Sequence, residues 1–178
     1  NTQLSIAAIM LGLAVLGYFD DRFDLRSSIR FAAHFAAAGF AIFVLGPIES
    51  IQLPWILKIQ LGFAAIPFTL LFIVWMINLY NFMDGMDGFA GGMTFFGFTT
   101  FAILFAMQNN TEYAVSVLVP ATAAIGFLLY NFPPAKIFLG DAGSTAIGFL
   151  SATSMMVASI ENSIPFWVSV MIFSPFII

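Results

Sequence analysis

The sequence has no cysteine, a single histidine and few charges: only 8% of its 178 residues are Asp, Glu, Lys or Arg. The absence of cysteine excludes disulfides, although it does not identify a compartment. The shortage of charge argues against a water-soluble fold, because 61% of the residues are hydrophobic and the mean hydropathy is +1.02, far above the usual composition of soluble domains. The composition therefore indicates a membrane protein, and we expect no nucleic-acid partner.

Charged residues divide the chain into seven uncharged windows of 17 to 25 residues. A transmembrane helix needs roughly 20 apolar residues to cross the bilayer core, and it satisfies its own backbone hydrogen bonds in lipid. We therefore predict an all-α fold, a polytopic transmembrane helical bundle of about seven helices. It forms a single domain over residues 1–178, which we expect to be truncated at both ends. The windows are 1–19, 31–48, 59–83, 88–111, 113–135, 142–160 and 162–178.

Helices that alternate across a membrane place the first, third and fifth loops on one face. Four of the five basic residues lie on this face, which the positive-inside rule assigns to the cytoplasm. Six of the nine acidic residues also lie there, and because acids do not count in that rule their clustering needs another cause. These acids are Asp20, Asp21, Asp24, Asp84, Asp87 and Asp141. On the opposite face we expect a short strand within residues 45–55.

The first loop, residues 17–30, has the sequence GYFDDRFDLRSSIR. Its adjacent carboxylates, Asp20 and Asp21, are costly at a helix end near lipid unless a cation or a proton compensates them. The pair is followed by Asp24, and the interleaved Arg22 and Arg26 are donors suited to phosphate oxygens. A solvated helix cap is the alternative interpretation.

The third loop, residues 78–92, has the sequence NLYNFMDGMDGFAGG and places Asn78, Asn81, Asp84 and Asp87 three residues apart. If the helix continues through it, all four lie along one side, whereas the glycines would instead permit a turn. Either geometry concentrates amide and carboxylate oxygens at the membrane boundary. A glycine-rich turn alone would not explain four polar residues in register.

The fifth loop, residues 130–144, has the sequence YNFPPAKIFLGDAGS. Asp141 lies where the next helix begins, so an ordinary N-cap is the alternative to a functional role. We also expect that helix N-terminus to offer free backbone N–H groups to a phosphate.

The three loops together bring oxygen ligands and basic groups to one face. Such ligands suit Mg²⁺, or Mn²⁺, rather than Zn²⁺. Because Mg²⁺ bound by a few carboxylates completes its shell with phosphates and water, a diphosphate substrate is expected. His34 lies one turn after Arg30 inside the second predicted helix, where a neutral, hydrogen-bonded histidine is favoured over a functional one.

Three motifs occur in order between the predicted helices: DDRFD at 20–24, NLYNFMDGMDG at 78–88 and NFPPAKIFLGDAGS at 131–144. With them the chain resembles, over essentially its whole length, the polyprenyl-phosphate N-acetylhexosamine-1-phosphate transferases, the membrane enzymes of bacterial glycosyltransferase family 4. The resemblance implies transfer of a sugar phosphate from a UDP-N-acetylhexosamine to polyprenyl (undecaprenyl) phosphate, giving polyprenyl-diphospho-sugar and UMP. The DDRFDL form is more similar to the branch that starts surface polysaccharides of the O-antigen kind than to the wall-precursor enzyme.

The resemblance also implies roles for individual residues. Asp20, Asp21, Asp84 and Asp87 are expected to be catalytic. Asp141 and Asp87 are expected to bind the metal. The nucleotide-sugar site would be lined by Asn78, Asn81, Asn131, Lys136 and Phe138, with Phe138 a candidate to stack on uracil. The family implies a multi-pass protein of the inner (plasma) membrane, with the site facing the cytoplasm and a homodimer as one possible assembly. Its members carry a further His-containing loop, so we expect these 178 residues alone to be insufficient for activity.

Two other functions are compatible with acidic loops in a membrane protein. An intramembrane prenyltransferase would carry its aspartates in two repeated motifs with wider spacing, which leaves the third acidic loop unexplained. A cation transporter would place its acids near the bilayer midplane, often in broken helices. The six acids cluster instead at one boundary, which favours the transferase.

Overall fold

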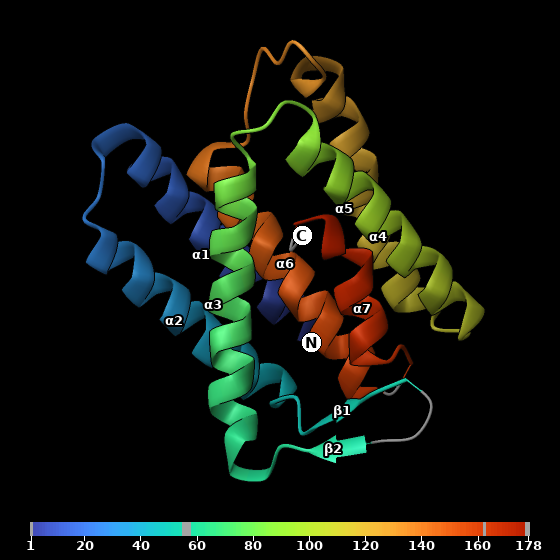
Figure 1. The fold of residues 1–178 in the computed structure, drawn as a ribbon. Coiled ribbons are helices and arrows are strands. Elements are labelled where there is room, and N and C mark those ends of the chain that lie inside the picture. The colour runs from blue at the N-terminus through green and yellow to red at the C-terminus, as the bar shows by residue number, and fades with distance from the viewer. Residues whose placement is uncertain (1, 55–57, 162, 177–178) are drawn as a thin grey trace.

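A computed structural model describes residues 2–54, 58–161 and 163–176 of the chain. The fold is helical throughout apart from one small hairpin (Figure 1). The elements are α1 (Thr2–Phe23), α2 (Ser27–Leu45), β1 (Ser50–Gln52), β2 (Lys58–Gln60), η1 (Gly62–Ala64), α3 (Ala65–Met83), α4 (Phe89–Met107), α5 (Thr111–Asn131), α6 (Gly140–Ile160), α7 (Phe166–Ile172) and η2 (Ser174–Phe176).

Within these residues, six helices are long and apolar enough to cross a membrane by length and composition. The predicted helical membrane fold with about seven helices is therefore confirmed, but the seventh helix is too short to span a bilayer. Window 162–178 contains two prolines, Pro165 at the N-cap of α7 and Pro175 in η2. Because proline lacks a backbone donor and disfavours helix at the preceding residue, α7 ends after seven residues.

Helix α6 forms the centre of the bundle. In its apolar window 72% of the residues are buried, against 50% or fewer in each of the other spans. It packs mainly against α1 and α3, while α4 packs mainly against α5 to one side (Figure 1). Small residues permit this position, since a Cβ added at Gly148 would lie 2.8 Å from the Cα of Ile77 in α3. Close backbone approach at small residues is typical of helix packing in membranes.

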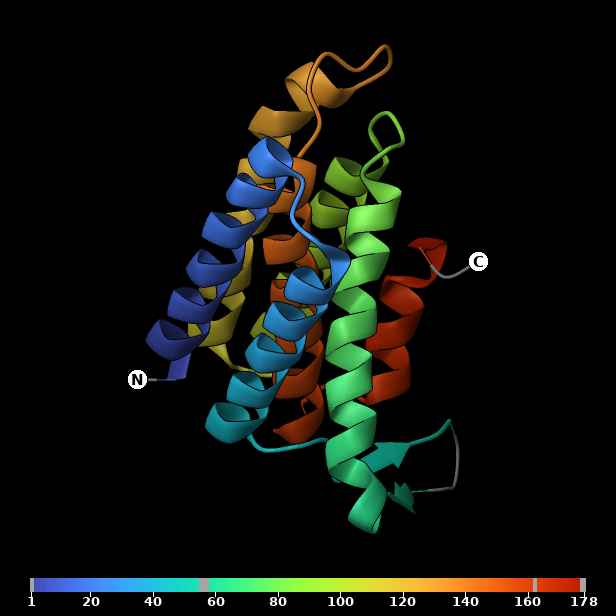
Figure 2. The ribbon, with the colours of Figure 1, turned by 90° about the vertical axis from the view of Figure 1, so that its left-hand side faces the viewer.

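The α1–α2, α3–α4 and α5–α6 connections lie together at one end of the bundle, as the alternation of helices predicts (Figure 2). The hairpin lies at the opposite end. Its strands pair antiparallel, with Ile51 opposite Ile59, so the short strand predicted within residues 45–55 is confirmed. The three motifs therefore meet at the first end.

We predict that Gly148→Ala destabilises the full-length protein, because the new methyl group would meet the backbone of α3 and force the two helices apart. Overpacking of this kind costs about 1–3 kcal/mol, so the midpoint of thermal unfolding in detergent should fall by several degrees. Gly126→Ala in α5 is the matched control, since a Cβ there meets nothing within 4 Å. If Gly148→Ala unfolds at the same temperature as Gly126→Ala, α6 and α3 do not pack as closely at Gly148 as the structure shows.

Candidate active site

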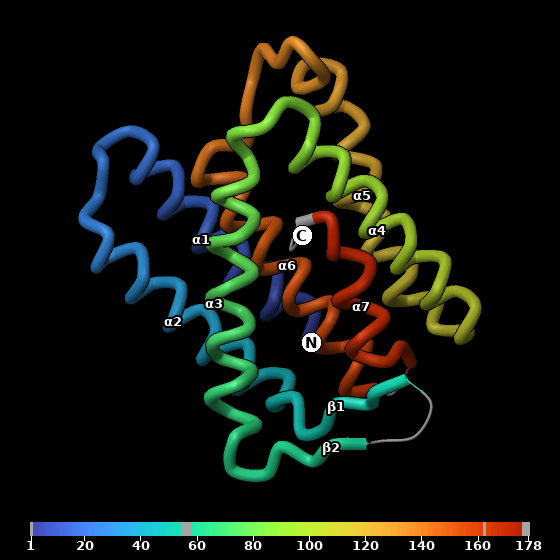
Figure 3. Tube along the Cα trace, in the orientation of Figure 1, coloured from blue at the N-terminus to red at the C-terminus, as the bar shows by residue number. Residues whose placement is uncertain are grey.

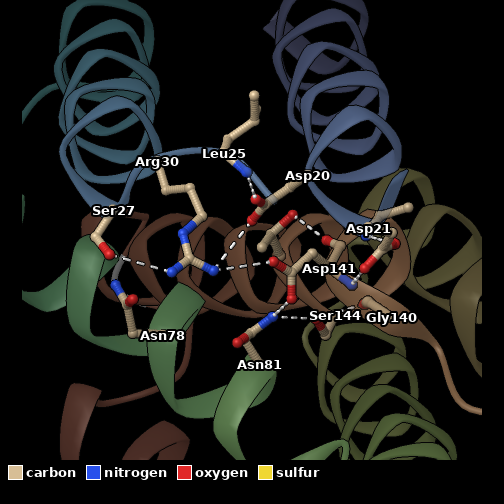
Figure 4. Close-up of polar contacts among 12 residues, drawn as sticks. Asp20, Asp21, Leu25, Ser27, Arg30, Asn78, Asn81, Gly140, Asp141 and Ser144 are labelled. Carbon is tan, nitrogen blue, oxygen red and sulfur yellow. Dashed lines mark hydrogen bonds and ion pairs between the residues drawn. The ribbon is translucent and has the colours of Figure 1, made fainter. Parts of the chain in front are cut away.

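Four helices converge on one cluster of polar side chains (Figure 4). Asp20 lies in the last turn of α1, Arg30 in the first turns of α2, Asn81 near the end of α3, and Asp141 at the start of α6. Residues far apart in the sequence thus meet because four helices end or begin at the same level.

An arginine joins the two central carboxylates. The Nη1 atom of Arg30 lies 3.1 Å from Oδ2 of Asp20 and 3.4 Å from Oδ2 of Asp141. The Asp20 side chain is only 4% exposed, compared with 23% for Asp141 and 37% for Arg30. Two carboxylates this close repel each other unless a positive charge or a shared proton compensates them, and the Arg30 guanidinium supplies such a charge.

The remaining oxygens of this pair are fixed by neutral donors. Oδ1 of Asp20 accepts the backbone N–H of Leu25 at 2.8 Å. The side-chain amide of Asn81 donates to Oδ1 of Asp141 and to the Ser144 hydroxyl oxygen, the latter at 3.0 Å. Each carboxylate therefore has one oxygen held by a neutral group and one turned to Arg30.

The cluster lines a cavity of about 130 Å³ at the end of the bundle. This volume has room for a few water molecules or a phosphate-sized group. The polar lining comes from Asp20, Ser27, Arg30, His34, Asn78, Asn81, Asp141 and Thr145, and the apolar part from α1 and Phe31. The site is therefore a small polar cavity that opens where the helices end.

The N-terminus of α6, beside this cavity, is closed by two carboxylates. Asp84 accepts the N–H groups of Leu139 and Gly140 at 3.1 and 2.8 Å, and Asp21 accepts those of Asp141 and Ala142 at 2.9 and 3.2 Å. The expectation that this terminus offers free N–H groups to a phosphate is therefore wrong. Anionic side chains satisfy the unpaired donors and the helix dipole instead.

Asp84 is buried in this role, with 6% of its surface exposed. Burial raises the pKa of the Asp84 carboxyl and so does the nearby charge of Asp21, while the two backbone hydrogen bonds oppose this effect. The pKa lies above its ordinary value on balance, because two neutral donors do not fully replace water around a buried carboxylate.

The family model for glycosyl transferase family 4 matches residues 3–159 of the chain. The chain belongs to glycosyl transferase family 4. It is 34% identical over 153 residues to a probable undecaprenyl-phosphate N-acetylglucosaminyl 1-phosphate transferase of Bacillus subtilis, covering 83% of this chain and 42% of that protein. It is 31% identical over 182 residues to the phospho-N-acetylmuramoyl-pentapeptide-transferase of Staphylococcus aureus, covering 93% and 56%. The chain thus spans about half the length of these relatives, and the resemblance seen in its motifs is confirmed.

The structure divides the predicted site residues of this family 4 chain into two groups. Asp20, Asp141, Asn78 and Asn81 line the cavity. The others lie outside the cavity lining in the part of the chain that the structure describes: Asp21, Asp84, Asp87, Asn131, Lys136 and Phe138. Their proposed functional roles stay predictions, but several have a clear contact with the backbone.

The second group mainly fixes the α5–α6 loop, which lies beside the α3–α4 loop (Figure 3). Asn131 is fully buried, accepts the Gly88 N–H at 3.0 Å and donates to the Ile137 carbonyl at 2.8 Å. Asp87 accepts the Ala135 N–H at 2.9 Å. Lys136 and Phe138 are exposed on this loop, where their side chains can meet a ligand that approaches from outside.

Arg30 and His34 belong to the cavity although neither was predicted as a site residue. Asn78 Nδ2 lies 3.4 Å from Nδ1 of the buried His34. This contact fits a histidine bonded inside the bundle, in which Nδ1 accepts from the amide. The spacing of four residues between Arg30 and His34, which puts both on one helix face, is the signal that could have found them.

No group of three or more His, Cys, Asp or Glu side chains suited to share a metal ion occurs in residues 2–54, 58–161 and 163–176. Asp141, one of the two predicted metal ligands, lines the cavity together with Asp20. Asp87, the other predicted ligand, lies outside the cavity lining and accepts the Ala135 N–H. Mg²⁺ is usually bound by one or two carboxylates, with substrate phosphates and water completing its shell. The pair of Asp20 and Asp141 therefore fits a metal shared with a phosphate ligand rather than one held in a cage of protein groups.

We predict that Asp84→Asn destabilises the full-length protein by about 1–3 kcal/mol, because an amide has one acceptor oxygen for two N–H groups and adds a donor beside them. Thermal unfolding in detergent measures the loss. Asp24→Asn is the control: it also removes one negative charge, and asparagine tolerates the left-handed conformation of this exposed position. Equal stability of the two variants would show that Asp84 does not fix the α6 terminus.

Proposed function

We propose that this chain is the membrane-embedded catalytic region of an enzyme that transfers N-acetylhexosamine 1-phosphate from a UDP-sugar to polyprenyl phosphate. The products are polyprenyl-diphospho-sugar and UMP. One observation carries the proposal: Asp20 and Asp141, from two helices, share the Arg30 guanidinium in a cavity that Asn78 and Asn81 also line. Membership of glycosyl transferase family 4 and the names of the two relatives support it.

This cluster suits phosphoryl transfer, which depends mainly on in-line positioning and on neutralising charge as it develops. Asp20 and Asp141 would hold Mg²⁺. When bound there, it would supply positive charge to offset that of the diphosphate oxygens and of the leaving UMP. Arg30 supplies planar N–H donors to phosphate oxygens, and Asn81 fixes the orientation of Asp141.

The acceptor phosphate needs little help from a general base. A phosphate monoester has a second pKa of roughly 6, so it is already largely dianionic at neutral pH. Asp20, whose two oxygens accept from Leu25 and Arg30, therefore acts as an orienting and charge-balancing group. The nucleophile is an oxygen of the lipid phosphate, which lies at the membrane boundary while its tail extends among the helices.

The orientation and the biological role follow from the same features. Most basic residues lie at the end of the bundle that carries the cavity. We therefore place this end on the cytoplasmic face of a bacterial inner membrane. UDP-sugars are cytoplasmic, which agrees with this placement. The DDRFDL form of the first motif leads us to propose the start of surface-polysaccharide synthesis, with an N-acetylhexosamine as the transferred sugar.

The decisive experiment measures transfer of radiolabelled sugar phosphate from UDP-GlcNAc and other UDP-sugars to undecaprenyl phosphate, in membranes that contain the full-length protein. We expect a lipid product and UMP, both lost with EDTA. Asp141→Asn should lower the rate at least about 100-fold, because it removes a charged group that faces the reacting phosphates. Asp24→Asn, which removes a charge from the same face outside the cavity, should retain most of the activity.

Different failures have different meanings. If no UDP-sugar reacts although the protein is folded and binds Mn²⁺, the substrate assignment is wrong. If product forms equally well with EDTA and in Asp141→Asn, the enzyme class stands and the metal site does not.

A further inference from the structure

Arg30 occupies the position between the two cavity carboxylates that a metal ion would need. A single nitrogen, Nη1, contacts Oδ2 of Asp20 and Oδ2 of Asp141. The other oxygen of each carboxylate is held by Leu25 and Asn81. Those neutral contacts do not depend on the guanidinium, so the two Oδ2 atoms lose their contact with Arg30 together when this side chain turns away.

The arginine is also placed so that it can leave. Its side chain is 37% exposed, and beyond the carboxylates its one side-chain hydrogen bond among the described residues is to the Ser27 hydroxyl, 3.3 Å from Nη2. Ser27 and Arg30 are both on α2 and both line the cavity. Because its one other hydrogen bond is to a hydroxyl of its own helix, this long, flexible side chain can turn away from the two carboxylates while α2 stays in place.

We propose that Arg30 is a placeholder cation: it neutralises Asp20 and Asp141 in the free protein and competes with the divalent metal for the same two oxygens. The inference rests on the proposed function, because it takes the metal from there. Two carboxylates without a positive charge between them would repel each other in this cavity. Arg30 prevents that repulsion before the metal arrives, and its displaced donors become available to phosphate oxygens.

Competition between Arg30 and the metal for the same two oxygens predicts the size of the change in metal affinity. If the Arg30 contact is closed in roughly nine of ten molecules, the apparent affinity for metal is lowered about tenfold. Loss of the positive charge also strengthens the attraction of the carboxylates for a divalent ion. Both effects have the same sign, so removing the guanidinium should tighten metal binding, whereas loss of a merely structural group would weaken it.

The test is the affinity for Mn²⁺, measured by electron paramagnetic resonance of the free ion, with full-length protein in detergent and no substrate. Arg30→Gln should bind Mn²⁺ about tenfold more tightly than the natural protein. Arg30→Lys keeps a positive charge but is a compact, strongly hydrated group, so its affinity should lie between the two. Arg26→Gln removes a charge from the same loop, from a side chain with no ion pair in the described part of the chain, and should change the affinity less than twofold.

Thermal unfolding gives a second readout. Without metal, Arg30→Gln should unfold at a lower temperature than the natural protein, and Mn²⁺ should raise its midpoint by more. If Arg30→Gln does not fold, the Mn²⁺ affinity of Arg30→Lys is compared with that of the natural protein instead. Tighter binding by Arg30→Lys supports the placeholder role, and unchanged or weaker binding overturns it.

Unchanged or weaker Mn²⁺ binding in Arg30→Gln overturns the placeholder role, even if transfer activity is metal-dependent. If neither the natural protein nor Arg30→Gln binds Mn²⁺ at millimolar concentration, both the placeholder role and the proposed metal site are wrong. The transferase assignment is then decided by the product assay alone. Conversely, if Arg30→Gln binds Mn²⁺ tenfold more tightly although the natural protein uses no tested UDP-sugar, that result supports the placeholder role of Arg30 and rejects only the proposed substrate.

Discussion

Two carboxylates from other parts of the chain close the N-terminus of α6, and the position of Asp141 depends on this contact. Four consecutive N–H groups, those of residues 139–142, are accepted by Asp84 and Asp21. Unpaired backbone donors are costly where water is scarce, so the contact fixes where α6 begins. The Asp141 N–H donates to Asp21, while the Asp141 side chain faces Asp20 and Arg30 across the cavity.

The cavity also depends on helices that approach more closely than ordinary side chains permit. A Cβ at Gly17 in α1 would overlap the carbonyl oxygen of Asp141. Gly148 has the corresponding role against α3, two turns further along α6. These glycines bring α1 and α3 to opposite sides of one helix, so that short side chains such as Asp and Asn can meet across it.

The overall architecture could be predicted from the sequence because its causes are local. Uncharged windows, loop parity and three motifs identify the long helices and the end at which the polar residues gather. The short α7 was not foreseen from window length alone, since its two prolines interrupt the backbone irrespective of hydropathy.

The separate roles of the aspartates could not be predicted in this way. Asp20 and Asp21 are adjacent in sequence, but successive residues on a helix point about 100° apart, and only the packing of α1 against α6 decides which one faces the cavity. Likewise, Asn131 has a motif position suited to a ligand, yet its amide joins two loops. The spacing of Arg30 and His34 places both on one helix face, but the contact of Arg30 with Asp141 joins residues more than one hundred positions apart, which no local pattern predicts.

The α5–α6 loop is held almost entirely through its own main chain. Asp84, Asp87 and Asn131, the last residue of α5, bond to backbone N–H and C=O groups of residues 135–140, and none of these bonds uses a side chain of residues 132–139. The path of the loop is thereby independent of the side chains it displays. Exchange of the side chains at positions 136–138 can therefore change the exposed surface of the loop while its path, and the start of α6 behind it, stay the same.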